Sequence, residues 1–193
     1  GRNSRHYVMW HGGLGFITGG SAGDLHFRPG RSLAAHIGFS YKLKISKVLS
    51  WGGGLMVQFD NYSLDPYSDR FAAVPIRPAF DTERESIHLD FISPNTFVRL
   101  NFDPQRGSHY GRYLDLGIGL SRLIGQRVSY RRTLAEGGDH EESTRRQVDH
   151  FEPAHGYVFG RLGNKNFAFR YQYRFSDLIR TERLEQNALL AHY

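Results

Sequence analysis

The chain has 193 residues, no cysteine, a formal net charge of +6 and a mean hydropathy of −0.50. This length suits one domain, residues 1–193, with a sizeable core, and no stretch approaches the ~18 apolar residues of a membrane helix. The missing cysteines exclude disulfides and thiol chemistry, and the dispersed basic residues argue against a nucleic-acid partner. The 22 glycines and 14% aromatic residues favour an all-β protein.

Three runs at the start of the chain alternate apolar and polar residues with the period of a β-strand. They span about 6–18, 31–45 and 48–60. A glycine-rich loop at 19–30 separates the first two runs. A tight turn at Ser46 and Lys47 joins the second and third, so these two runs are predicted to form a β-hairpin.

The middle of the chain is less regular. Residues 61–85 combine prolines with scattered charges and are expected to form a long loop. A fourth strand is predicted at about 86–102, but its apolar positions change parity at Pro94, which indicates a bulge that resets the register. A turn at 103–107 leads into a fifth predicted strand at about 109–125.

The last part of the chain begins with a highly charged segment, 126–149, which is predicted to be a long mobile loop. Strands follow at about 150–162 and 167–175, separated by a short turn at 163–166. The final candidate strand, 184–193, is short and mixed in character, and it is the weakest of the predicted strands.

The run 167–175 shows the alternation most clearly, because every odd position is aromatic and the even positions include Arg170 and Arg174. In a soluble up-and-down barrel such as a lipocalin, the rings would point into the core. In a membrane barrel they would face lipid, and the arginines would face a polar lumen. The alternation in this run does not by itself decide between a soluble barrel and a membrane barrel.

The connections between strands alternate between short and long, and the strand faces opposite the apolar residues are rich in glycine. Both features are typical of a narrow membrane barrel. The sequence therefore predicts an eight-stranded antiparallel up-and-down transmembrane β-barrel with short periplasmic turns and long extracellular loops. Its expected location is a bacterial outer membrane with a periplasmic N-terminus, and a soluble barrel is the alternative.

Two groups of side chains follow from this orientation. Aromatic residues at the membrane interface are expected to form a girdle of Trp10, Trp51, Tyr41 and Tyr110. Charges inside a narrow lumen must be paired, so an arginine–aspartate network is expected to fill the barrel. Its predicted members are Arg170, Arg174, Asp115, Lys42, Lys44, Asp60 and Asp90.

Other chemistry has weaker support in the sequence. The run Asp139–Glu142 offers ligands for a divalent metal, but nearby arginines favour a solvated loop, so no metal or cofactor is expected. Ser21, Asp24 and His26 could serve a hydrolase at the barrel rim. No sequence motif identifies such a triad, so the protein is not expected to be an enzyme.

Several segments resemble the PorT-like family of small outer-membrane β-barrels. They are Phe97–Gly107, Gly111–Gly117 and Asn166–Leu178, together with the hairpin Ile37–Leu55. The resemblance covers most of 30–180. It implies an eight-stranded barrel in a bacterial outer membrane, and some members of the family serve type IX secretion and gliding. The chain departs from the family at its end, where members usually close with an alternating apolar strand.

The expected function is that of a non-enzymatic accessory or scaffold subunit in a larger outer-membrane complex for secretion, assembly or uptake. Its partners would be membrane lipid and a neighbouring protein bound by the loops 61–85 and 126–149. The alternatives are a barrel that binds a small ligand or forms a narrow channel, and a hydrolase or acyltransferase at the barrel rim.

Overall fold

The computed structural model describes nine segments of the chain, and they consist of β-strands and their connections. These segments are 5–18, 21–22, 25–26, 31–63, 82–103, 111–133, 140–146, 151–164 and 166–176. Within them, no helix has the length and apolar character needed to cross a membrane.

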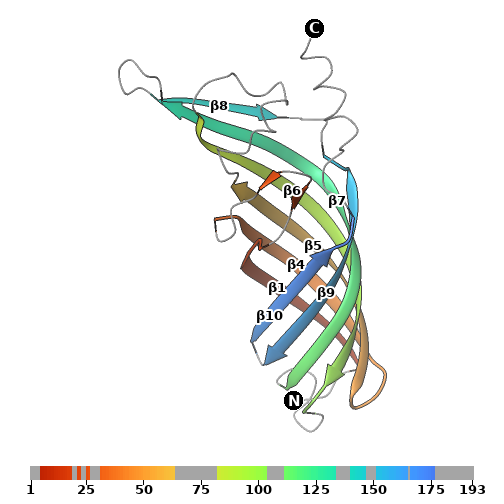
Figure 1. The fold of residues 1–193 in the computed structure, drawn as a ribbon. Helices are drawn as coiled ribbons and strands as arrows, with labels where there is room; N and C mark the ends of the chain where they lie inside the picture. Colours follow the sequence, from red (N-terminus) through yellow and green to blue (C-terminus); the bar gives the residue numbers. More distant parts are fainter. Residues whose placement is uncertain are drawn as a thin grey trace.

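Ten strands lie in these segments, and seven of them form one antiparallel up-and-down sheet (Figure 1). The strands are β1 (His6–Phe16), β2 (Ser21–Ala22), β3 (Leu25–His26), β4 (Leu33–Lys44), β5 (Leu49–Ser63), β6 (Thr82–Asn101), β7 (Arg112–Thr133), β8 (His140–Arg146), β9 (Ala154–Asn164) and β10 (Phe167–Arg174). The sheet order is β1-β4-β5-β6-β7-β9-β10, β8 pairs with β7, and β2 pairs with β3. The prediction of an all-β antiparallel meander is confirmed.

The sheet is curled, so that strands far apart in its order meet across one face (Figure 1). Arg174 of β10 contacts Asp60 and Tyr62 of β5, although three strands separate β10 from β5 in the sheet. We call this face the inner face and the opposite one the outer face. In the described segments the edge strands β1 and β10 are not paired with each other, so the fold is a curled half-barrel.

Successive side chains alternate between the two faces. The outer face is apolar, with Leu14 91% exposed, Phe167 85% exposed and Trp10 76% exposed. The rings of the run 167–175 lie on this face, whereas Arg170 and Arg174 lie on the inner face. The inner face combines buried charged groups with a small cluster of rings formed by Phe97, Tyr157 and Phe159.

Strand β6 corrects the prediction at Pro94. The pairing of β6 with β5 continues in step through Pro94, so no bulge resets that register. The apolar residues before it, Ile87, Leu89 and Phe91, are buried on the inner face, and the parity of β6 therefore never changes. The sequence prediction was wrong because it assumed that every apolar run faces outward. A register shift does occur at Asp90 and Phe91, but between β6 and β7.

The charged segment 126–149 is a second correction, because much of it is strand and not loop. Strand β7 continues to Thr133 and pairs with β8, which prolongs the sheet beyond β4 and β5 (Figure 1). The register places Arg131 opposite Glu142 and Arg132 opposite Glu141. The strand pairing therefore continues through a segment whose charges had suggested a loop.

The remaining predicted strands correspond to β1, β4, β5, β9 and β10 with small differences at their ends. The predicted closing strand, 184–193, lies outside the described residues, as do residues 64–81 of the expected long loop. The two-residue strands β2 and β3 lie in the segment expected to be a glycine-rich loop.

Gly38 occupies a position of β4 where the neighbouring strand comes very close. A Cβ atom there would lie 2.5 Å from the Leu55 carbonyl oxygen and 2.9 Å from the Met56 Cα. Both are backbone atoms of β5 and cannot rotate away. A Cβ at Gly15 of β1, in contrast, would meet no atom within 4 Å.

Gly38→Ala is therefore expected to lower the free energy of unfolding by about 1–3 kcal/mol, because the added methyl group would push β4 and β5 apart. The urea midpoint of unfolding, followed by tryptophan fluorescence, measures this loss. Gly15→Ala is the matched control and should leave the midpoint nearly unchanged. Equal midpoints for the two variants would contradict the close approach at Gly38.

Candidate functional site

The most buried ionic group of the inner face is the carboxylate of Asp115 on β7, whose side chain is 0% exposed. Arg99 of β6 binds it through two hydrogen bonds, from Nε to Oδ1 at 2.6 Å and from Nη2 to Oδ2 at 2.9 Å. Arg161 of β9 adds a third, from Nε to Oδ2 at 2.7 Å. Charge-assisted, bidentate contacts of this kind are the strong form of hydrogen bond.

The strand register brings these three residues together. Asp115 stands directly opposite Arg99 on one side and opposite Arg161 on the other. Aromatic rings support both guanidinium groups, because the Arg99 Cζ lies 3.6 Å from the Tyr113 ring centroid and the Arg161 Cζ lies 5.2 Å from that of Phe97. The single carboxylate balances the charge of one arginine, and its hydrogen bonds hold both guanidinium groups in place.

A second network surrounds Asp60 of β5. Gln58 Nε2 donates to its Oδ1 at 2.8 Å, and the Tyr62 hydroxyl donates to its Oδ2 at 3.1 Å. Arg174 completes the network from β10, donating from Nη2 to Asp60 Oδ2 at 3.3 Å and from Nη1 to the Tyr62 oxygen at 3.1 Å. This ion pair crosses the inner face and joins the edge strand to the middle of the sheet.

Arg170 of β10 lies on the inner face without a carboxylate partner in the described part of the chain. Its Nη1 donates to the Met56 Sδ at 3.3 Å and its Nη2 to the Gln172 Oε1 at 3.0 Å, and its Nε has no acceptor. The guanidinium carbon lies 4.3 Å from the Phe159 ring centroid. Arg170 is thus held by neutral groups only.

The other predicted members of the inner network lie as follows. Lys42 is buried on the inner face, with its Nζ 5.5 Å from the Tyr7 ring centroid. Lys44 is half-buried on the same face. Asp90 requires a correction, because it alternates with the buried residues Leu89 and Phe91 and so lies on the outer side of β6. The assumed parity change at Pro94 had placed Asp90 inside.

Two residues of the Asp115 network were missed by the sequence analysis, namely Arg99 and Arg161. Arg99 lies between Val98 and Leu100, which point outward from β6, so the alternation of side chains along the strand could have placed it on the inner face. Arg161 lies in the strand with the weakest alternation of polarity, where the inner positions also include apolar rings. No signal in the sequence identified its partner.

Three of the four predicted girdle residues are described, and all three are on the outer face. Trp10 packs against Phe39 with ring centroids 5.6 Å apart, and the Tyr41 hydroxyl forms a hydrogen bond with the His6 ring. Trp10 is paired with Phe39, whereas Trp51 is paired with Leu43, so they lie four positions apart along β4. Tyr110 lies outside the described residues.

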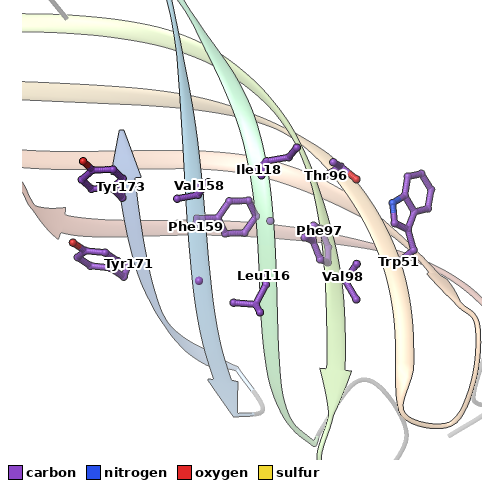
Figure 2. Close-up of a pocket in the computed structure, with 12 residues that line it drawn as sticks. Trp51, Thr96, Phe97, Val98, Leu116, Ile118, Val158, Phe159, Tyr171 and Tyr173 are labelled. Carbon is purple, nitrogen blue, oxygen red and sulfur yellow. The ribbon is translucent and has the colours of Figure 1, made fainter. Parts of the chain in front are cut away.

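The outer face is hollowed into an apolar groove of about 560 Å³ over strands β6, β7 and β9 (Figure 2). Trp51 of β5 stands at one end, and Tyr171 and Tyr173 of β10 stand at the other (Figure 2). Gly117 and Gly160 form part of the floor. A Cβ at Gly160 would meet only the Leu116 Cδ2 at 3.8 Å, so free space lies above this glycine.

The structure adds no supporting geometry for the possible hydrolase triad or for the possible metal-binding run. Ser21 and His26 are paired in the β2–β3 hairpin, but Asp24 lies outside the described residues, as does Asp139 of the possible metal-binding run. Among the residues that the structure describes, no group of three histidines, aspartates or glutamates could hold a metal ion.

Comparison of the chain with protein-family models, with curated proteins and with solved structures gave no match. The resemblance to the PorT-like family therefore remains a prediction from the sequence segments.

Asp115→Asn is expected to destabilise the protein by about 3–5 kcal/mol, because it leaves two buried guanidinium groups without their shared counter-charge. Urea midpoints and slopes give the difference in free energy of unfolding. Arg112→Gln is the control, since Arg112 is 67% exposed in its ion pair with Asp103 and should cost less than about 1 kcal/mol. Similar small losses in both variants would argue against a stabilising role for the Asp115 network.

Proposed function

We propose that this protein is a bacterial outer-membrane β-barrel that acts as a non-enzymatic accessory or scaffold subunit of a larger outer-membrane complex. The observation that carries the proposal is the distribution of polarity between the two faces of the sheet. Large apolar side chains cover the outer face, whereas ion pairs lie on the inner face. A soluble barrel has the reverse arrangement, and a membrane barrel has this one.

The extent of the apolar outer face supports lipid as the surrounding medium. Exposed rings and aliphatic side chains recur on all seven strands of the main sheet, from Trp10 on β1 to Phe169 on β10. Soluble monomers rarely expose contiguous apolar patches larger than a few hundred Å². A hydrocarbon environment removes the cost of that exposure and also explains why the charged groups gather on the other face.

Strand direction supports closure by one further strand. Because the seven strands alternate in direction, β1 and β10 run the same way and cannot form an antiparallel ladder with each other. A single strand antiparallel to both would close the sheet into a barrel of eight. An even number of antiparallel strands is the rule for bacterial outer-membrane barrels.

A packed interior favours a scaffold over a wide pore. The rings of Phe97, Tyr157 and Phe159 are buried on the inner face beside the arginines, and an eight-stranded interior is filled by side chains or holds at most one small ligand. The outer groove between Trp51 and Tyr173 is then the surface proposed for contact with a neighbouring membrane protein. Given the resemblance to the PorT-like family, the complex that we propose is a secretion machine of the type IX class.

The membrane location can be tested with the two tryptophans of the chain, Trp10 and Trp51. In lipid bilayers, brominated acyl chains are expected to quench the fluorescence of each, because both indoles are exposed on the outer face, where a girdle at the membrane interface would contact the acyl chains. The variants Trp10→Phe and Trp51→Phe separate the two signals, and acrylamide in the water phase should quench weakly. Strong acrylamide quenching without bromolipid quenching would favour a water-soluble barrel.

The scaffold role can be tested by filling the groove. Gly160→Leu places a side chain in free space above the groove floor, so the barrel should still fold and migrate differently in detergent gels before and after boiling. The native complex, extracted in mild detergent, is expected to lose this subunit in the variant. Gly15→Ala on β1 is the control outside the groove. A full-size complex containing Gly160→Leu would contradict docking at this surface.

A further inference from the structure

The inner face carries more positive than negative charge. Its acidic groups are Asp60 and Asp115, and its basic groups are Lys42, Lys44, Arg99, Arg161, Arg170 and Arg174. Both carboxylates are already engaged, Asp115 by two arginines and Asp60 by Arg174. Neither carboxylate is therefore left to pair with Arg170 within the described part of the inner face.

Three of these basic groups and one acidic group lie in one row of residues that crosses four consecutive strands. Arg99 on β6, Asp115 on β7, Arg161 on β9 and Arg170 on β10 stand opposite one another in the strand register. The signs along the row are positive, negative, positive and positive. Arg161 and Arg170 are thus like charges directly across a strand pair, which is a destabilising arrangement when nothing lies between them.

The acid that acts on Arg170 is Asp115, which is already paired with Arg99 and Arg161. His11 of β1 and His36 of β4 also lie on the inner face, where both imidazoles come under the positive charge of Arg161 and Arg170. Their ring centroids are 5.9 Å apart, and His11 Nε2 is hydrogen-bonded to Ser40 Oγ at 3.1 Å. The Nε of Arg170 has no acceptor, its two Nη groups donate to a thioether and an amide oxygen, and its guanidinium carbon lies 5.8 Å from the Tyr157 ring centroid.

We propose that Arg170, with Arg161, His11 and His36, forms a binding site for a small oxyanion of the phosphate or carboxylate class inside the curl of the sheet. The planar guanidinium presents paired donors that match two oxygens of such an anion. An anion beside Arg170 would balance the charge of the one arginine in the row that Asp115 does not bind. It would also supply the acceptor that the buried Nε lacks.

The position of the site gives a solute access to it. Arg170, His11 and His36 are half-buried, in contrast to Asp115, which is fully buried. Arg170 belongs to the edge strand β10 and His11 to the edge strand β1, so the site lies between the two ends of the described sheet. The proposal concerns the inner face only, and it does not depend on what surrounds the outer face.

Inorganic phosphate is the probe for the test, with chloride at equal ionic strength as the reference. Thermal unfolding of the full chain in a non-ionic detergent is followed by circular dichroism. Phosphate is expected to raise the midpoint in a saturable way, by roughly 3–6 °C at ten times its dissociation constant. Isothermal titration calorimetry should give one bound phosphate per chain.

Arg170→Gln should abolish the saturable rise, whereas Arg112→Gln, which alters an exposed arginine on the outer side of β7, should retain it. This comparison separates a site from the general stabilising effect of phosphate on proteins. If Arg170→Gln does not fold, Arg170→Lys keeps the charge but loses the paired donors and should bind phosphate at least tenfold more weakly.

Two results would overturn the proposal. One is a wild-type midpoint that responds to phosphate no more than to chloride, which would mean that another part of the chain balances Arg170. The other is an equal phosphate response in wild type and Arg170→Gln, which would place any anion elsewhere.

Discussion

The buried carboxylate of Asp115 is the interaction on which the inner face depends. It lies between two guanidinium groups from the neighbouring strands, with hydrogen bonds of 2.6 to 2.9 Å. Without it, Arg99 and Arg161 would be buried charges without a counter-charge, which costs several kcal/mol per group. Because all three residues stand opposite one another in register, the ion pairs also oppose slippage of β6 and β9 along β7.

The shape of the sheet follows from what its inner face must hold. Long side chains and rings fill the curl, so the positions between them are glycine or serine, and Gly38 brings β4 and β5 together where a methyl group would not fit. The charged network needs this narrow space, because ion pairs strengthen where water is excluded. The apolar side chains are then left on the outer face, and the proposed scaffold role rests on that face.

Much of the fold could be predicted from the sequence, since period-two alternation located most of the main strands. The errors arose where apolar side chains face inward and where a charged segment forms a strand. Ile87, Leu89 and Phe91 are apolar but face inward, so the sequence suggested a bulge at Pro94 that the β5–β6 pairing does not contain. The charged residues after 126 suggested a loop because polarity by itself does not reveal that Arg131 stands opposite Glu142 in the register.

The sequence by itself determined which residues alternate, and so it identified Arg170 and Arg174 as lying opposite a wholly aromatic strand face. Only the tertiary structure decided their partners. Arg174 reaches Asp60, whereas Arg170 stands beside Arg161 and reaches no carboxylate in the described segments. The physical reason is that alternation is a property of one strand, set by local backbone geometry. Ion pairing depends on register between strands and on the curl that brings β10 over β5, and both arise only when the sheet assembles.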